Sequence, residues 1–296
     1  MRTGFFRGAL SAGVLLGALA FASFAEAAAK KVLVVTTTTG FRHSSIPTAE
    51  KVLGELAERN GDFQVEYARV EPNDAAFKGA DGKPDKEKVN AAIQKVLAEK
   101  MNPGALKTYD AIIFANTTGD LPVPDKEAFM SWIRDGGAFV GMHSATDTFH
   151  GYPPFIEMIG GEFKSHGPQV EVEAINRDKE CPACRHLEST WKLYDEIYLF
   201  KSFDPTKVYE VLNLDKHPND KTPGSYPIAW TKTYGRGRVF YTSLGHREDI
   251  WDPETPESIK RMNSKEIALA YQQHILGGIK WTLGLEKWSP KPLAVE

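Results

Sequence analysis

Four histidines stand at turn-like positions where an α/β protein can place its chemistry. Each lies beside a glycine or at the end of an apolar, strand-like run. Histidine suits acid–base catalysis and metal binding near neutral pH, and α/β proteins bind their ligands at the carboxyl ends of strands. We therefore expect four separate segments to form one pocket, and they carry His43, His143, His166 and His246.

The segment around His143 has the form of a nucleophile elbow. An apolar run at 138–142 leads to His143, and small residues stand two positions before and two positions after it, Gly141 and Ala145. Such a turn holds its central residue in a strained backbone conformation, with the side chain projecting above the sheet. Because this residue is neither Ser nor Cys, glutaminase and ordinary serine-hydrolase chemistry are disfavoured.

Two kinds of chemistry fit these histidines. In the first, His143 and His246 act as general acid and base while Asp147 orients one imidazole. In the second, His43, His143 and His246 bind a divalent metal ion such as zinc or manganese and leave a position open for water or substrate. The sequence holds no His-x-His or His-x-x-x-His pair, so spacing does not choose between the two.

The elements that must position these residues alternate along the chain. Strand patterns at 31–36, 63–70, 109–115 and 138–142 are separated by helix patterns at 47–60, 85–100 and 124–134. This rhythm predicts a doubly wound, mainly parallel sheet. Later strand patterns lie at 169–176, 196–200, 208–213, 227–233 and 238–243, and several of these strands are expected to pair antiparallel at one edge. The segment 264–283 is the closing helix.

The first 27 residues have the features of a secretory signal peptide. Arg2 and Arg7 precede an apolar run at 8–25, which ends in Ala-Glu-Ala at 25–27. The mature chain, 28–296, is then expected to be a single domain that is secreted or periplasmic. No membrane association is expected after cleavage.

Composition and cysteine usage narrow the partners. The formal net charge is −3, and basic and acidic residues are mixed throughout, so nucleic acid is not an expected partner. The chain has two cysteines, Cys181 and Cys184, and in an oxidising compartment this Cys-x-x-Cys pair predicts a local disulfide, with redox catalysis as the minor alternative. The oligomeric state stays open, and a homo-oligomer is compatible with the sequence.

Four segments together resemble the ThuA-like, trehalose-utilisation family. They are TTGFRH at 38–43, GMHSATDTF at 141–149, GGEFKSH at 160–166 and GRGRVFYTSLGH at 235–246. The resemblance implies a flavodoxin-like fold related to class I glutamine amidotransferases, with His143 at the elbow in place of cysteine. It places His246 near the position of the amidotransferase histidine.

The resemblance also implies a small-molecule carbohydrate as the partner. The family is associated with bacterial carbohydrate use, and some members with breakdown of sugars oxidised at the 3 position. We therefore expect a hydrolase or lyase acting on a sugar or 3-keto glycoside, not a glutaminase. The alternative is a periplasmic sugar-binding or accessory protein without turnover.

Four residues are expected to contact such a substrate. Glu248 and Trp251 follow His246, and an aromatic beside a polar group suits the face of a sugar. Arg42 precedes His43 in the first segment, and His166 lies in a Lys-Ser-His-Gly turn. These four complete the predicted site.

The predicted signal peptide can be tested directly. When the full chain is expressed with an export pathway, we expect the mature protein to begin at Ala28, because the Ala-Glu-Ala motif ends at Ala27. N-terminal sequencing and intact mass of the exported protein measure this. A mature protein that retains residues 8–25 would instead indicate an uncleaved anchor.

Overall fold

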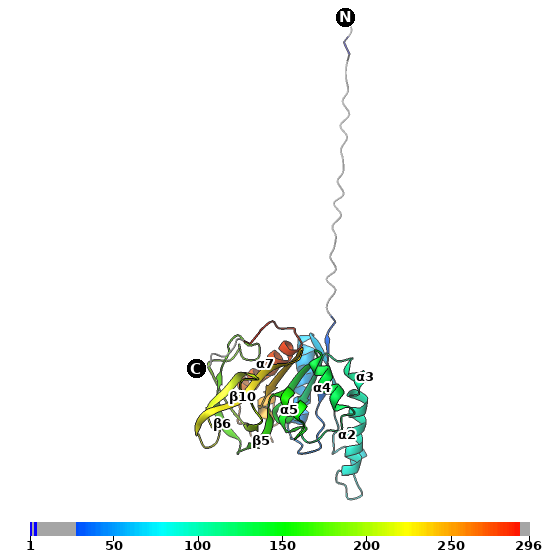
Figure 1. Cartoon of the computed structure of the whole chain (residues 1–296), viewed down its shortest axis with the longest axis vertical. Helices are drawn as coiled ribbons and strands as arrows, with labels where there is room; N and C mark the ends of the chain where they lie inside the picture. The colour runs from blue at the N-terminus through cyan, green and yellow to red at the C-terminus, as the bar shows by residue number, and fades with distance from the viewer. Residues whose placement is uncertain (2, 5–27, 291–296) are drawn as a thin grey trace.

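A nine-stranded sheet forms the centre of the protein, with strand order β2-β1-β3-β4-β11-β10-β9-β6-β7. Figure 1 shows helices packed around this sheet. The computed structural model describes residues 1, 3–4 and 28–290. The predicted signal peptide therefore lies almost wholly outside the described residues. Among the residues described, no helix combines the length and apolar character needed to cross a membrane.

The described residues form helices and strands in an alternating order through the first half of the chain. The strands are β1 (Lys30–Val35), β2 (Phe63–Ala68), β3 (Ala111–Ala115), β4 (Ala138–Met142), β5 (Glu162–His166), β6 (Val170–Asn176), β7 (Thr190–Asp195), β8 (Tyr198–Lys201), β9 (Tyr209–Lys216), β10 (Pro223–Tyr234) and β11 (Gly237–Thr242). The helices are α1 (Ile46–Asn60), α2 (Lys86–Lys100), α3 (Pro103–Leu106), α4 (Lys126–Arg134), α5 (Pro153–Ile159), α6 (Glu248–Trp251) and α7 (Lys265–Thr282), with 3-10 turns η1 (Ala75–Phe77) and η2 (His143–Asp147).

The predicted fold class is confirmed, and the antiparallel part is larger than expected. Strands β2, β1, β3, β4 and β11 pair in parallel, and β10, β9, β6 and β7 extend the sheet by antiparallel pairing at one edge. Sequence patterns did not predict β7, nor β5, which pairs with β8 in a separate two-stranded sheet. This small sheet brings His166, the last residue of β5, beside the elbow region.

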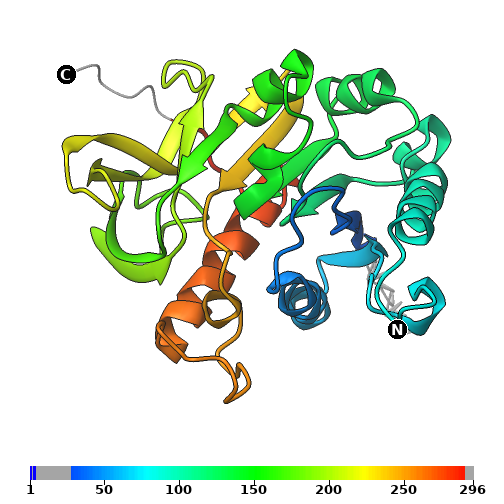
Figure 2. The same cartoon turned by 90° about the horizontal axis from the view of Figure 1, so that it is seen from below.

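Alternating side chains of the parallel strands fill two cores, one on each face of the sheet. Val32 and Val34 belong to the core under α1 and α7, whereas Leu33 and Val35 face α2, α4 and α5. Figure 2 shows α1, in blue, and α7, in orange, on the same side of the sheet. A sheet covered on both faces explains why these strands are nearly continuous apolar runs.

Cys181 and Cys184 are free thiols in this structure and not the disulfide expected for an oxidising compartment. Both are buried, and the Cys184 thiol donates a hydrogen bond to the carbonyl oxygen of Val211, at an Sγ–O distance of 3.7 Å. Burial, together with the neighbouring thiol, raises the pKa of Cys184 well above its usual value. Cys184 therefore packs in the core as a protonated thiol, which is a poor nucleophile.

Helix α7 carries a fully buried histidine, His274, which lies far from the elbow in sequence. His274 lies within hydrogen-bonding distance of the carbonyl oxygen of Ala183, at 2.8 Å, and of the Thr242 hydroxyl, at 3.1 Å. Burial lowers the pKa of His274 to about 3. The imidazole is therefore neutral in the folded protein at pH values where it would be protonated in the unfolded chain.

We expect His274→Gln to destabilise the protein by about 2 kcal/mol at pH 7, because its buried hydrogen bonds are disturbed. The difference from wild type should shrink as pH falls from about 6.5 towards 3. In that window the unfolded wild-type chain binds a proton that the folded protein excludes, which costs up to about 1.4 kcal/mol per pH unit. Urea denaturation at several pH values measures both effects, and a constant difference would contradict the neutral, buried histidine.

Candidate functional site

Three predicted histidines and one carboxylate meet above the carboxyl edge of the parallel strands. His43 lies in the loop after β1, His143 follows β4, and His246 follows β11. Their ring centroids are separated by 4.7 Å between His43 and His143, 5.2 Å between His43 and His246, and 5.1 Å between His143 and His246. We call His43, His143, Glu196 and His246 the histidine cluster.

The backbone at His143 has the strained elbow conformation expected from the sequence. Its φ is 48°, in the left-handed region that non-glycine residues rarely adopt. A side chain at Gly141 would approach Tyr241 to 3.0 Å and Ala145 to 3.2 Å, so only small residues fit around the turn. The Tyr241 hydroxyl donates a 2.6 Å hydrogen bond to the carbonyl of His143, which holds the turn in place.

The elbow pattern predicted that the His143 side chain projects above the sheet, but the side chain is fully buried. Its Nδ1 lies 2.8 Å from the carbonyl oxygen of Ser243, just after β11. A carbonyl oxygen only accepts hydrogen bonds, so Nδ1 carries the ring proton and Nε2 presents a lone pair to the cluster. Metal-ligating histidines commonly donate their other ring N–H to a backbone carbonyl in this way.

The distances within the cluster match those between ligands of one metal ion. His143 Nε2 lies 3.2 Å from His43 Nε2 and 3.2 Å from His246 Nδ1. Glu196 Oε1 lies 3.2 Å from His246 Nδ1 and 3.7 Å from His143 Nε2. Zinc bonds of about 2.0–2.1 Å in a tetrahedral site separate ligand atoms by roughly 3.3 Å. The cluster could therefore hold a metal ion.

Burial keeps two of the imidazoles neutral. Desolvation, followed by repulsion from His246, lowers the pKa of His43 to about 3. Desolvation also lowers the pKa of His143 well below its usual value, and the charges that His43 and His246 would carry add to this. Metal ions bind the neutral imidazole, so both rings are in the ligating form at neutral pH.

Glu196 raises the pKa of the third histidine, His246. Burial of His246 lowers its pKa, but the hydrogen bond and the charge of Glu196 outweigh burial, and the net shift is upward. The loop that carries His246 is fixed by Asp195, whose buried carboxylate accepts a 2.7 Å hydrogen bond from the backbone N–H of Gly245. Asp195 and Glu196 therefore position His246 from the antiparallel part of the sheet.

Sequence reasoning missed Glu196, although it predicted all three histidines of the cluster. The pattern at 196–200 was interpreted as a strand, and no motif marks an acidic residue there as a ligand. The one available signal was the Asp-Glu pair at 195–196, between two strand-like runs. The sequence does not show that this segment folds back beside the carboxyl ends of the parallel strands, so the pair could not be placed near the histidines.

His166 reaches the cluster through Glu196. Its Nδ1 lies 3.0 Å from Glu196 Oε2 and 3.0 Å from the carbonyl oxygen of Gly167. Because both neighbours are acceptors, Nδ1 carries a proton, and Nε2 is the ring nitrogen left to accept one. The side chain is 43% exposed, and its ring stacks on Tyr198, which also contacts His143. His166 is the exposed histidine of the site.

Asp147 does not orient an imidazole of the cluster. It lies at the end of η2, and its carboxylate forms an ion pair with His150, which is not one of the four predicted histidines. His150 also contacts Glu162 at 2.8 Å, at the start of β5. The short 3-10 turn directs Asp147 towards this network, so the expectation of a direct contact with the cluster is wrong.

The predicted substrate residues are placed differently from one another. Trp251 is fully buried, donates a hydrogen bond to the carbonyl of Gly245 and packs against Tyr271, so it presents no face to a sugar. Glu248 is half-buried and close enough to contribute to the raised pKa of His246. The structure therefore removes Trp251 from the candidate binding surface.

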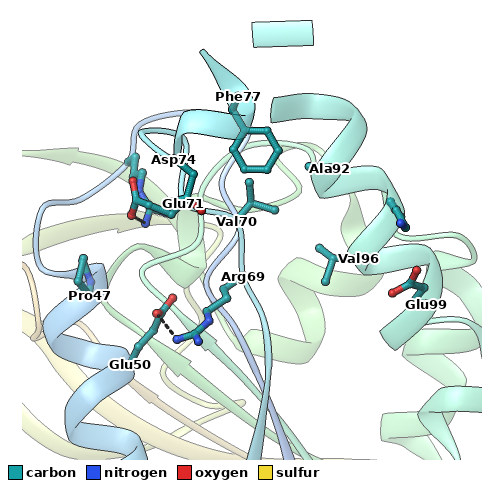
Figure 3. A pocket seen from close by; sticks show the side chains of 12 residues that line it. Pro47, Glu50, Arg69, Val70, Glu71, Asp74, Phe77, Ala92, Val96 and Glu99 are labelled. Carbon is teal, nitrogen blue, oxygen red and sulfur yellow. Dashed lines mark hydrogen bonds and ion pairs between the residues drawn. The ribbon is translucent and has the colours of Figure 1, made fainter. Parts of the chain in front are cut away.

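Arg42 turns away from the cluster and pairs with Glu71 at 2.8 Å. It lines a cavity of about 530 Å³ between α1 and α2, which no cluster residue lines. Figure 3 shows this cavity, with Arg69 paired to Glu50 on one side and Val96 and Glu99 of α2 on the other. Its charged side chains are mostly paired with each other, so the cavity carries no separate assignment.

Fold and site together define a doubly wound α/β protein in which a histidine occupies the elbow and a cluster of three histidines and one glutamate lies at the carboxyl edge of the sheet. The family model described as "Trehalose utilisation" (ThuA) matches residues 31–262. The chain belongs to the ThuA family. None of the curated proteins compared with it matches.

Solved structures of similar fold support this placement. A putative ThuA-like protein from Bacteroides uniformis is 18% identical, with a TM-score of 0.62 over 88% of this chain and 94% of that one. Another from Parabacteroides merdae is 19% identical, with a TM-score of 0.60 over 90% of this chain and 94% of that one. At these identities the likeness shows the shared fold.

Glu196→Gln should weaken binding of zinc or manganese by about 10- to 100-fold, because a neutral amide replaces the charged oxygen at the cluster. In the chelator-treated protein it should also lower the pKa of His246, since the partner that raises this pKa is lost. Metal titration and NMR titration of the His246 ring measure the two effects.

Glu210→Gln is the matched control, because Glu210 is also buried but lies on β9, outside the cluster. This control should bind the metal as wild type does. Equal metal affinity in all three proteins would exclude Glu196 as a ligand.

Proposed function

We propose that the histidine cluster binds a divalent metal ion, zinc or manganese, and that the protein uses this site to process a sugar or a glycoside oxidised at carbon 3. The observation that carries the proposal is the convergence of four ligand atoms, all within 4.8 Å of one another, with the lone pair of His143 directed among them. The trehalose-utilisation family supports a carbohydrate substrate.

Four residues would hold the ion: His43, His143 and His246 through ring nitrogens, and Glu196 through Oε1. Three nitrogens and one carboxylate oxygen are a donor set that suits zinc and also accommodates manganese. When bound, such an ion supplies Lewis acidity towards a substrate oxygen. These ligands would hold the ion in a defined position, since the Ser243 carbonyl fixes the ring of His143 and the Asp195 carboxylate fixes the loop that carries His246.

A ketone at carbon 3 makes a particular reaction accessible. It acidifies the hydrogen on carbon 2, and removal of this proton allows the C1–O glycosidic bond to break. The leaving oxygen takes the bonding electrons and is protonated, while a double bond forms between carbons 1 and 2. The overall reaction is an elimination, and later addition of water makes it a hydrolysis. The proposed enzyme is therefore a lyase or hydrolase.

In the proposed reaction, His166 accepts this proton. Its Nδ1 proton is held by Glu196 and Gly167, so the basic Nε2 is available, and the side chain is accessible to a substrate from solvent. An imidazole positioned within reach of the substrate can act as a general base. His43 and His143 are buried and neutral, so they serve as ligands and not as bases.

The proposal includes export of the protein to the periplasm or outside the cell, on the basis of the signal-peptide features at 1–27. It takes a small carbohydrate as the partner and requires neither nucleic acid nor a membrane. A homo-oligomer stays compatible with this function.

His143→Asn should abolish metal binding and reduce kcat by at least about 100-fold while the protein stays folded. Asparagine tolerates positive φ and its amide can donate to the Ser243 carbonyl, but it lacks the ligating Nε2. Metal analysis and steady-state assays on native and 3-keto disaccharides measure these effects. His274→Gln is the matched control, because it changes a buried histidine outside the cluster.

Chelation separates the alternatives for this site. A metal-dependent enzyme loses activity with chelator and regains it with zinc or manganese, whereas metal-free acid–base catalysis survives chelator. Full turnover and full metal content in His143→Asn would contradict the proposed function. Sugar binding without turnover in the wild type would favour a sugar-binding or accessory protein.

A further inference from the structure

One exposed aromatic side chain lies directly beside the histidine cluster. Phe41 is 66% exposed. Among the described residues, every other Phe, Tyr and Trp side chain is buried or half-buried. Its ring centroid lies 4.9 Å from that of His43, with the two planes nearly perpendicular. A ring with this exposure leaves apolar surface open to solvent next to a proposed metal ligand.

The loop that displays Phe41 is held firmly by its neighbours. The Thr118 hydroxyl donates a 2.7 Å hydrogen bond to the carbonyl of Phe41, and the N–H of Thr39 donates to the carbonyl of Thr118 at 3.1 Å. The N–H of Gly119 in turn donates to the carbonyl of Asp147 in the elbow turn, at 2.9 Å. The position of Phe41 is therefore tied to that of the elbow, and the ring does not depend on a free loop.

A close approach explains why the loop contains glycines at this point. A side chain at Gly119 would meet the backbone nitrogen of Gly40 at 2.7 Å and the Thr39 hydroxyl at 2.5 Å, and a side chain at Gly40 would meet the Thr118 hydroxyl at 3.0 Å. The two loops pack backbone against backbone. This packing leaves the Phe41 side chain outside while its main chain is fixed.

We propose that Phe41 is the platform on which a pyranose ring of the substrate stacks while its reacting carbons face the histidine cluster. This inference rests on the proposed function and names the part of the site that binds the sugar ring. Pyranose rings present a face of C–H groups, and binding sites pair apolar and aromatic surfaces with a few polar groups. An exposed aromatic ring provides large contact area and loses little conformational entropy on binding.

Phe41 also takes over the role predicted for Trp251, which was to provide an aromatic surface for the sugar. Trp251 follows His246 in the chain but is buried in the core, whereas Phe41 is exposed and contacts His43. Phe41 offers no metal-ligating atom. Its effect on substrate binding is therefore separable from metal binding.

Variants of Phe41 test the platform through the separation of KM from kcat. Phe41→Ala should raise KM, or the Kd if the protein binds sugars without turnover, by about tenfold or more, because the stacking surface is lost. We expect kcat to change by less than about threefold and the metal content to stay at the wild-type level. Phe41→Trp should retain tight binding, whereas Phe41→Leu, which is apolar but not flat, should bind more weakly than wild type.

Leu269→Ala is the matched control, since Leu269 is an exposed apolar residue on α7. Its KM should equal that of wild type. If wild type processes or binds sugars and Phe41→Ala behaves as Leu269→Ala does, the platform is wrong and the proposed function stands. If wild type neither binds nor turns over any sugar in a panel of native and 3-keto glycosides, both fail.

An exposed aromatic side chain can also contact a second copy of the chain. Sedimentation of the same variants tests this alternative. A monomeric wild type, or an oligomer that Phe41→Ala leaves intact, agrees with the platform. Dissociation of a wild-type oligomer by Phe41→Ala, with an unchanged KM, would identify Phe41 as an interface residue and overturn the proposal.

Discussion

The hydrogen bond from His143 Nδ1 to the carbonyl of Ser243 determines what the site can do. It joins the ends of two adjacent parallel strands, β4 and β11, and it fixes the tautomer of a fully buried imidazole. Because Nδ1 donates, Nε2 has no proton to offer His43 or His246. One lone pair then faces two other ring nitrogens and a carboxylate, an arrangement that could hold a cation.

The surroundings of this bond explain how the strained elbow is tolerated. The positive φ of His143 is stabilised by the Tyr241 hydroxyl and by tight packing around Gly141. Strain of this kind persists where the surrounding structure over-determines it. The same packing buries His143 and lowers its pKa, so these contacts fix both the backbone and the charge of the residue.

Sequence patterns predicted the parallel strands, their helices and the three histidines at the strand ends, because each depends on local periodicity and on the shared edge of a parallel sheet. Glu196 was not predictable in this way. It reaches the cluster through strands that pair antiparallel over long sequence separations, and no local pattern encodes that path. Burial of Trp251 and the pairing of Asp147 with His150 likewise depend on tertiary packing that neighbouring residues in the sequence do not reveal.

The four residues of the histidine cluster come from segments separated by 50 to 100 residues, at positions 43, 143, 196 and 246. An unfolded chain therefore contains no local chelating motif among them, and it would hold a cation only weakly. Binding would be coupled to completed folding, and the free energy of binding would add to the stability of the native state alone. A truncated or misfolded chain would thus bind the cation poorly, and cation binding would distinguish it from the completely folded protein.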